Sequence, residues 1–186
     1  MNNKLEQLQR AYNAGEKPKF LFFWGHTPAA DGSVSPSCLS QWWMSRFEVD
    51  GIAYSCTEQY MMAEKARLFG DADALRKIMS ASQPKEMKAL GRAVKHFQST
   101  VWEQNCYEIV KRGNYAKFSQ NRRLREYLKS TKDLILVEAS PFDRIWGIGL
   151  EKDHPDAKNP LKWRGSNLLG FALTEVRDNL LEEEGS

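Results

Sequence analysis

The pair Asp50-Gly51 lies between two short strand-like runs, 46–49 and 52–55. Asp-Gly between such runs is a strong hairpin signal, because a type I′ turn needs positive φ at both central residues. Thr57 follows, and threonine is a favoured N-cap residue. The chain is therefore expected to reverse at this turn and then to enter a helix over 57–69.

Helical patterns dominate the remaining sequence. We expect helices over 5–12, 71–79, 84–91, 99–117, 121–130 and 166–181, strands over 20–25 and 134–138, and loops over 27–38 and 140–164. The predicted class is mainly α with a small antiparallel β-sheet (α+β). We expect one domain over 1–186 with its core at about 20–181 and with peripheral ends, a helix over 2–14 and a tail over 182–186. Neither GxGxxG nor GxxxxGK[ST] occurs, which argues against Rossmann and P-loop folds.

Composition narrows the functional classes. The chain has 186 residues, 41% hydrophobic and 27% charged, as in ordinary globular proteins. A net charge of +3 permits anionic ligands but is low for a dedicated nucleic-acid binder. There is no apolar leader and no apolar run of the ~20 residues that span a bilayer, so we expect a cytoplasmic protein without a membrane partner. The sequence does not indicate an oligomeric state.

The three cysteines and three histidines are widely spaced and form no CxxC or other zinc-ligand pattern. We therefore expect no disulfide framework and no metal site. The residues concerned are Cys38, Cys56, Cys106, His26, His96 and His154.

Glu58 and Lys65 are the first candidates for catalysis. They are seven residues apart, which places them on one face of the expected helix, about 10.5 Å apart along its axis. Met61 and Met62 lie between them, so this stripe is expected to face inward. The pair suits an acid or base beside a nucleophilic amine. The alternative is a helix-start glutamate and a lysine whose amine extends outward to solvent.

A second candidate group lies in the loop after the strand over 134–138. Asp143 precedes Trp146-Gly147, where glycine allows close approach of backbone to a ligand and tryptophan can stack on a base. The alternative is a turn with a core tryptophan. Trp24 and Trp42, near other strand ends or loops, could contribute to the same kind of base pocket.

Two further positions suit phosphate. Asn167 stands at the start of the helix over 166–181, where N–H groups favour anions, although it can equally be only an N-cap. Arg92 ends the helix over 84–91 and can bind phosphate as a fork, although it can equally lie on a solvated helix end.

Together these motifs resemble the NADAR family, also called YbiA-like. The order is Trp24-Gly25, Val49-Asp50-Gly51, Thr57-Glu58…Lys65, Gly91-Arg92, Lys117-Phe118, Glu138-Ala-Ser-Pro-Phe-Asp143-Arg-Ile-Trp146-Gly147, Gly165-Ser-Asn167-Leu-Leu-Gly170 and Val176-Arg177. Each motif alone is weak, but the ordered set is specific and spans about residues 20–181. Many members carry Glu-His-Tyr and some carry Asn-Phe where this chain has Glu58-Gln59-Tyr60 and Gln41-Trp42. Those differences leave the candidate catalytic residues in place and concern the shape of the base pocket, and therefore the choice of substrate.

The resemblance implies an N-glycosidase that cleaves the bond between a phosphorylated ribose and a base. The implied substrate is a phosphoribosylamino-pyrimidine intermediate of riboflavin synthesis. The alternatives are an enzyme acting on ADP-ribosylated guanine in nucleic acid and a non-catalytic ADP-ribose-binding module. No cofactor is implied.

The resemblance also implies roles for individual residues. The catalytic residues are Glu58, Lys65 and Asp143, and the substrate-binding residues are Trp24, Gly25, Trp42, Arg92, Trp146, Gly147 and Asn167.

Overall fold

The computed structural model describes residues 3–185, which form two compact units. Unit 1 contains the described residues up to Ser40 and those from Glu126 onward, and unit 2 is Gln41–Arg125. Each unit is described by itself. In the described part of the chain no helix is both long and apolar enough to cross a membrane.

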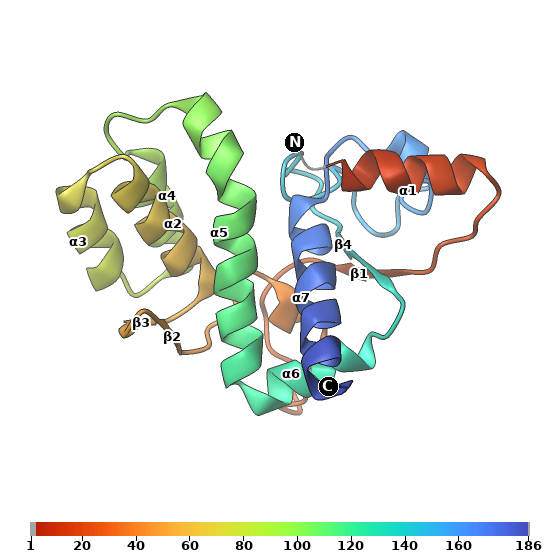
Figure 1. The fold of residues 1–186 in the computed structure, drawn as a ribbon, viewed down its shortest axis with the longest axis horizontal. Coiled ribbons are helices and arrows are strands. Elements are labelled where there is room, and N and C mark those ends of the chain that lie inside the picture. The colour runs from red at the N-terminus through yellow and green to blue at the C-terminus, as the bar shows by residue number, and fades with distance from the viewer. Residues whose placement is uncertain (1–2, 186) are drawn as a thin grey trace. The chain divides into compact units, whose positions relative to one another are not determined.

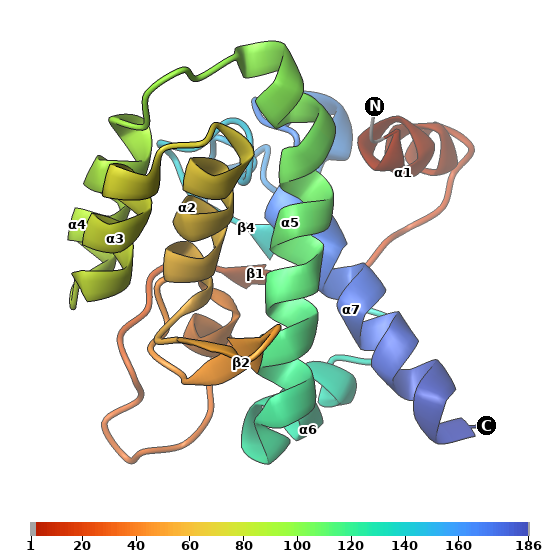
Figure 2. The same cartoon turned by 60° about the vertical axis from the view of Figure 1, so that its left-hand side comes forward.

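Unit 2 is built around one central helix. Its elements are β2 (Phe47–Val49), β3 (Ile52–Tyr54), α2 (Thr57–Leu68), α3 (Ala72–Ser80), α4 (Pro84–Arg92) and α5 (Ser99–Gln120). Helix α2 packs against α3, α4 and α5, and these four helices can be followed in Figures 1 and 2. Because neighbours cover it on several sides, eight of its twelve residues are buried.

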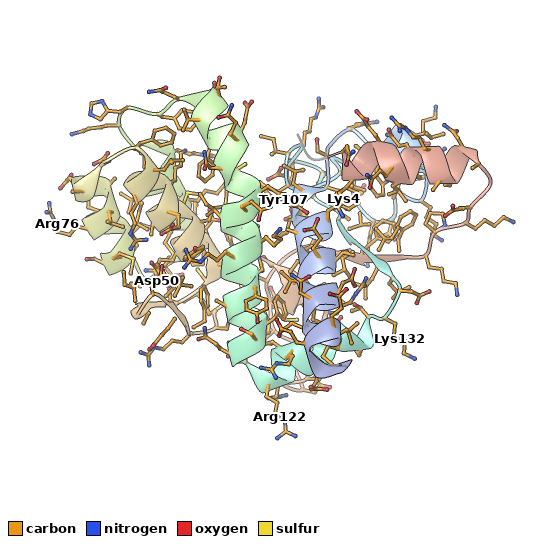
Figure 3. The ribbon with its side chains drawn as sticks, in the orientation of Figure 1. Lys4, Asp50, Arg76, Tyr107, Arg122 and Lys132 are labelled. Atoms are coloured by element: carbon orange, nitrogen blue, oxygen red, sulfur yellow. The ribbon has the colours of Figure 1, made fainter. Side chains whose placement is uncertain are left out.

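The predicted hairpin is present. Strands β2 and β3 are antiparallel, with Val49 opposite Ile52, and the turn residues Asp50 and Gly51 have φ of 52° and 77°. Both carboxylate oxygens of Asp50, labelled in Figure 3, lie 2.8 Å from Nη2 of Arg112 on α5. The turn is thus held by its own backbone preference and by an ion pair to the longest helix of the unit.

The starts of α2 and α3 differ in their capping. Asp71, at the N-cap of α3, accepts a hydrogen bond from the backbone N–H of Ala74. The expectation that Thr57 is the N-cap of α2 is wrong: Cys56 holds that position. The Thr57 hydroxyl instead donates to the carbonyl of Gln41, 3.2 Å away. This bond to a residue distant in sequence occupies the side chain that was expected to cap the helix.

Unit 1 joins the two ends of the chain. It contains α1 (Lys4–Asn13), β1 (Phe20–Phe23), η1 (Pro36–Leu39), β4 (Ile135–Glu138), η2 (Pro160–Lys162) and α7 (Leu168–Gly185); α6 (Arg122–Ser130) crosses the boundary with unit 2. Strands β1 and β4 pair in parallel, with Phe20 opposite Ile135. Helix α7 packs on β4 (Figure 1).

The predicted class, mainly α with a small antiparallel sheet, is confirmed. The structure adds the parallel β1–β4 pair, which local patterning did not indicate. The expected peripheral tail over 182–186 is helical as far as Gly185, and residue 186 lies outside the described residues. The single-domain description stays a prediction.

Gly170 fixes how closely α7 approaches β4. A Cβ at this position would lie 2.0 Å from the carbonyl oxygen of Leu136 and 2.5 Å from Oδ1 of Asn167. Since backbone cannot move aside cheaply, only glycine fits.

We therefore expect Gly170→Ala to lower the free energy of unfolding by about 1–3 kcal/mol through overpacking. Helix propensity alone would raise it by about 1 kcal/mol. Chemical denaturation measures the difference, with Lys85→Ala, an exposed position on α4, as a control expected within about 0.5 kcal/mol of the parent. A stabilised Gly170→Ala protein would contradict this packing.

Candidate functional site

Glu58 lies in the first turn of α2, where the positive end of the helix dipole favours a carboxylate. Only 6% of its surface is exposed. Its backbone N–H donates to the carbonyl of Gln41, 3.0 Å away. This contact holds the segment that carries Trp42 against the start of the helix. Trp42 directly follows Gln41, whose carbonyl accepts the bond from Glu58.

Gln41 is itself anchored on both sides. Its Oε1 accepts from Nδ2 of Asn114, 2.8 Å away, and its Nε2 lies 3.7 Å from the sulfur of Met61. The half-buried Trp42 ring lies 5.8 Å from Nζ of Lys88, measured to the ring centroid. Gln41 therefore acts as scaffold, and Trp42 is the member of this pair that remains partly exposed.

Gln59, where many relatives of the family carry histidine, has a structural role. Its Oε1 accepts from the backbone N–H of Ser55, 2.8 Å away, and its Nε2 donates to the carbonyl of Ile78, 3.1 Å away. That carbonyl belongs to the last turn of α3, where helix carbonyls need outside partners. The side chain thus joins three segments of unit 2. The Gln59 side chain is committed to these bonds.

Lys65 is half-buried. Its Nζ lies 4.3 Å from the ring centroid of Phe97 and 5.5 Å from that of Trp102. Sequence reasoning missed both aromatic residues, because Phe97 lies in the connection after α4 and Trp102 in the first turns of α5, and no local pattern links either with α2.

The environment of Lys65 lowers the pKa of its amine. Burial is the main cause, and the positive charge of Arg92 is the second. The aromatic faces attract a cation, but they also remove water from it, and loss of water favours the neutral amine. A lysine that is desolvated and close to another cation is an activated nucleophile.

Arg92 reaches this position because α4 packs closely on α2. A Cβ on Gly91 would lie 1.9 Å from Sδ of Met62 and 2.7 Å from its Cγ, so the two helices meet at this glycine. Arg92 follows on the exposed side. The structure gives it an electrostatic role toward Lys65, and its expected contact with phosphate stays a prediction.

Other nucleophiles in unit 2 are less suited. Burial raises the pKa of the thiols of Cys56 and Cys106, which keeps both protonated and unreactive. Within residues 3–185 no group of three or more His, Cys, Asp or Glu is arranged to hold a metal ion.

Unit 1 contains the second group of expected site residues. Oδ1 of Asp143 accepts from the backbone N–H groups of Ile145 and Trp146, at 2.8 and 2.7 Å. The hydroxyl of Ser140 accepts in turn from the N–H of Asp143, 3.2 Å away. One carboxylate oxygen therefore shapes the loop, and among the described residues Oδ2 accepts no hydrogen bond. The half-buried Trp146 is positioned directly by this turn.

Glycine and aromatic residues complete this group. A Cβ on the buried Gly147 would lie 2.8 Å from the carbonyl oxygen of Glu138, so its lack of a side chain serves loop packing. Trp24, 56% exposed, precedes Gly25, whose φ is +82°. The ring of Trp24 lies 6.1 Å from that of Phe142, an exposed residue that the sequence analysis had not singled out.

Asn167 differs from expectation. It is fully buried with φ of 52°; its Oδ1 accepts from the N–H of Glu138 and its Nδ2 donates to the carbonyl of Leu136, both at 3.0 Å. It therefore attaches the start of α7 to β4 and is neither an ordinary N-cap nor open to phosphate. The backbone N–H groups of residues 166–169 are also occupied, by carbonyls of residues 144–147. The expected phosphate contact at this helix start is wrong.

Comparison with known proteins identifies the family. The NADAR domain pattern matches residues 22–181. This chain belongs to the NADAR family. The matched range agrees closely with the span of the family resemblance, about residues 20–181.

Relatives carry informative names. The chain is 41% identical over 168 residues to "N-glycosidase R617" of Acanthamoeba polyphaga mimivirus, covering 88% of this chain and 97% of the relative. It is 30% identical over 137 residues to "N-glycosidase YbiA" of Escherichia coli K12, covering 74% and 77%. The solved structure of E. coli YbiA superimposes with a TM-score of 0.72 at 25% identity, covering 91% of this chain and 89% of that one. These names agree with the expected enzyme class, hydrolases of N-glycosyl bonds.

A further relative has a name that concerns a pathway. "Riboflavin biosynthesis protein PYRR, chloroplastic" of Arabidopsis thaliana is 32% identical over 115 residues. The match covers 60% of this chain but only 17% of that protein.

The pKa of Lys65 is directly testable. Reductive methylation with ¹³C-labelled formaldehyde followed by NMR at several pH values should give a lower pKa for Lys65 than for exposed lysines of the same sample. Arg92→Gln should raise it, because removal of a neighbouring cation makes protonation easier. An ordinary pKa in the parent protein, or one unmoved by Arg92→Gln, would contradict the described environment.

Proposed function

We propose that this chain is an N-glycosidase that hydrolyses the bond between C1 of a ribose 5-phosphate and the amino nitrogen of a pyrimidine, in an intermediate of riboflavin synthesis. The observation that carries the proposal is the half-buried amine of Lys65, whose pKa is lowered, on the same helix as the buried carboxylate of Glu58. The names of the relatives support the reaction class, and that of PYRR supports the substrate.

Lys65 is the proposed nucleophile. When the sugar ring opens, the ring oxygen takes a proton and C1 becomes an iminium carbon bonded to the pyrimidine nitrogen. The neutral amine of Lys65 adds its electron pair to C1 and loses a proton. The C1–N bond to the base then breaks, its electron pair and a proton leave with the base, and an imine between Nζ and C1 remains. Water hydrolyses this imine, which releases ribose 5-phosphate and restores the amine.

Glu58 is the proposed proton carrier for these steps. A carboxylate can stabilise positive charge at C1, accept the proton from the attacking amine or water, and return it to the leaving nitrogen.

Binding roles are proposed residue by residue. Each unit offers rings on which a base can stack: Trp42, half-buried, in unit 2, and Trp146, half-buried, and Trp24, exposed, in unit 1. The second carboxylate oxygen of Asp143 can accept from ribose hydroxyls. Gly25 and Gly147 contribute by letting the backbone turn and pack at their positions. We propose a small phosphoribosyl molecule as the partner and the cytoplasm as the location.

Release of ribose 5-phosphate from the phosphoribosylamino-pyrimidine intermediate tests the reaction. The intact protein should release it, and Glu58→Gln, which keeps the shape but cannot accept a proton, should lower kcat by about 10²–10⁴. Glu86→Gln is the matched control, since it makes the same change in the first turn of α4, where the carboxylate is exposed. Equal loss in both variants would remove the role of Glu58.

The two alternative functions are separated by the same assay. If the intact protein leaves this intermediate unchanged but frees ADP-ribose from ADP-ribosylated guanine, the substrate assignment is wrong and the reaction class stands. If it binds ADP-ribose and cleaves neither molecule, it is a binding module.

A further inference from the structure

Arg144 and Arg164 are two exposed cations of unit 1 that no other part of this account uses. Among the described residues neither guanidinium has an ion pair or a hydrogen bond. Several other exposed arginines are paired: Arg46 with Glu48, Arg76 with Asp73 and Arg112 with Asp50. The guanidinium groups of Arg144 and Arg164 are therefore available to bind an anion.

The fold brings the two side chains together. The N–H of Arg164 donates to the carbonyl of Ile148, 2.9 Å away, and the N–H of Ser166 donates to the carbonyl of Arg144, 3.1 Å away. A Cβ built on Gly149 would lie 3.0 Å from Cβ of Arg164 and 3.2 Å from Cγ of Arg144. Both side chains thus leave the backbone side by side over Gly149.

This closeness is set by a rigid framework. A Cβ on Gly165 would lie 2.7 Å from Cα of Arg144 and 2.3 Å from the carbonyl oxygen of Gly147, so the two segments touch through backbone. Because the two side chains leave the backbone this close together, both guanidinium groups can reach one anion, which would attract both. The neighbouring acid, Asp143, has one oxygen committed to the N–H groups of Ile145 and Trp146. Glu151, an exposed acid two residues after Gly149 in sequence, forms no ion pair with either arginine among the described residues.

We propose that Arg144 and Arg164 bind a phosphate monoester, namely the 5-phosphate of the ribose substrate. The inference rests on the proposed function, which makes a phosphorylated ribose the substrate. Guanidinium forks match the oxygens of a phosphate in pairs, and two forks can hold a dianion from two directions. The two arginines thus replace the start of α7 as the proposed phosphate-binding group, because the N–H groups of that helix start are already hydrogen-bonded.

Calorimetric titration of the full chain with ribose 5-phosphate, and with ribose as the unphosphorylated comparison, tests the site. Arg144→Gln and Arg164→Gln should each weaken binding of ribose 5-phosphate by about tenfold or more, the effect of losing a hydrogen bond to a charged group. Arg144→Lys should recover part of the loss, because it restores the charge without the fork. Lys162→Gln removes an exposed charge close in sequence to Arg164 and should change the affinity by less than about twofold. Affinity for ribose should be the same in all variants.

Several outcomes would overturn the proposal: no binding of ribose 5-phosphate by the intact protein, unchanged binding in both glutamine variants, or an equal loss for ribose. ADP-ribose is titrated in parallel, and if the variants weaken only ADP-ribose, the arginines hold a diphosphate and the monoester assignment is wrong. Arginine-dependent binding of ribose 5-phosphate in a protein that cleaves no phosphoribosyl substrate would leave this site intact while the proposed function fails.

Discussion

The burial of α2 among three other helices is the constraint on which unit 2 depends. A helix covered in this way has to account for every polar side chain it carries, because burying a polar group without a partner costs several kcal/mol. Gln59 meets this demand by bonding Ser55, directly after β3, and the carbonyl of Ile78 at the end of α3. Glu58 lies at the positive end of the helix, and the Lys65 amine lies against aromatic rings. Burial at this position lowers the pKa of the Lys65 amine, which favours its use as a nucleophile.

Unit 1 depends instead on close backbone packing. Gly147, Gly165 and Gly170 each stand where a Cβ would meet a carbonyl oxygen at less than 3 Å. The loop after β4 and the start of α7 consequently form one framework. Both the oxygen and the nitrogen of the Asn167 side-chain amide are hydrogen-bonded to the backbone of β4. A framework of this kind holds Asp143, Trp146 and the two arginines in fixed places, as a binding site requires.

Local rules in the sequence accounted for much of the fold. The Asp50-Gly51 turn, the Asp71 cap and the succession of helices depend on backbone preferences within a few residues, and the structure contains them. The errors arose where distant segments decided the outcome. The hydroxyl of Thr57 donates to the carbonyl of Gln41, and the side-chain amide of Asn167 donates to a carbonyl of β4. Neither side chain is left for the local role that the sequence indicated. For the same reason the spacing of Glu58 and Lys65 could place them on one face but could not show Phe97 or Trp102 beside the amine.

Lys65 is the proposed covalent nucleophile, and chemical trapping of its imine with the sugar tests this role most directly. Sodium borohydride added during turnover of the phosphoribosylamino-pyrimidine reduces an imine to a stable secondary amine, which mass spectrometry of the digested protein can assign to a residue. The account predicts a phosphopentose adduct on Lys65, formed only with substrate and borohydride together. Steady turnover with no adduct at Lys65, or with Lys65→Ala fully active, would contradict the covalent role and leave direct attack by water as the mechanism.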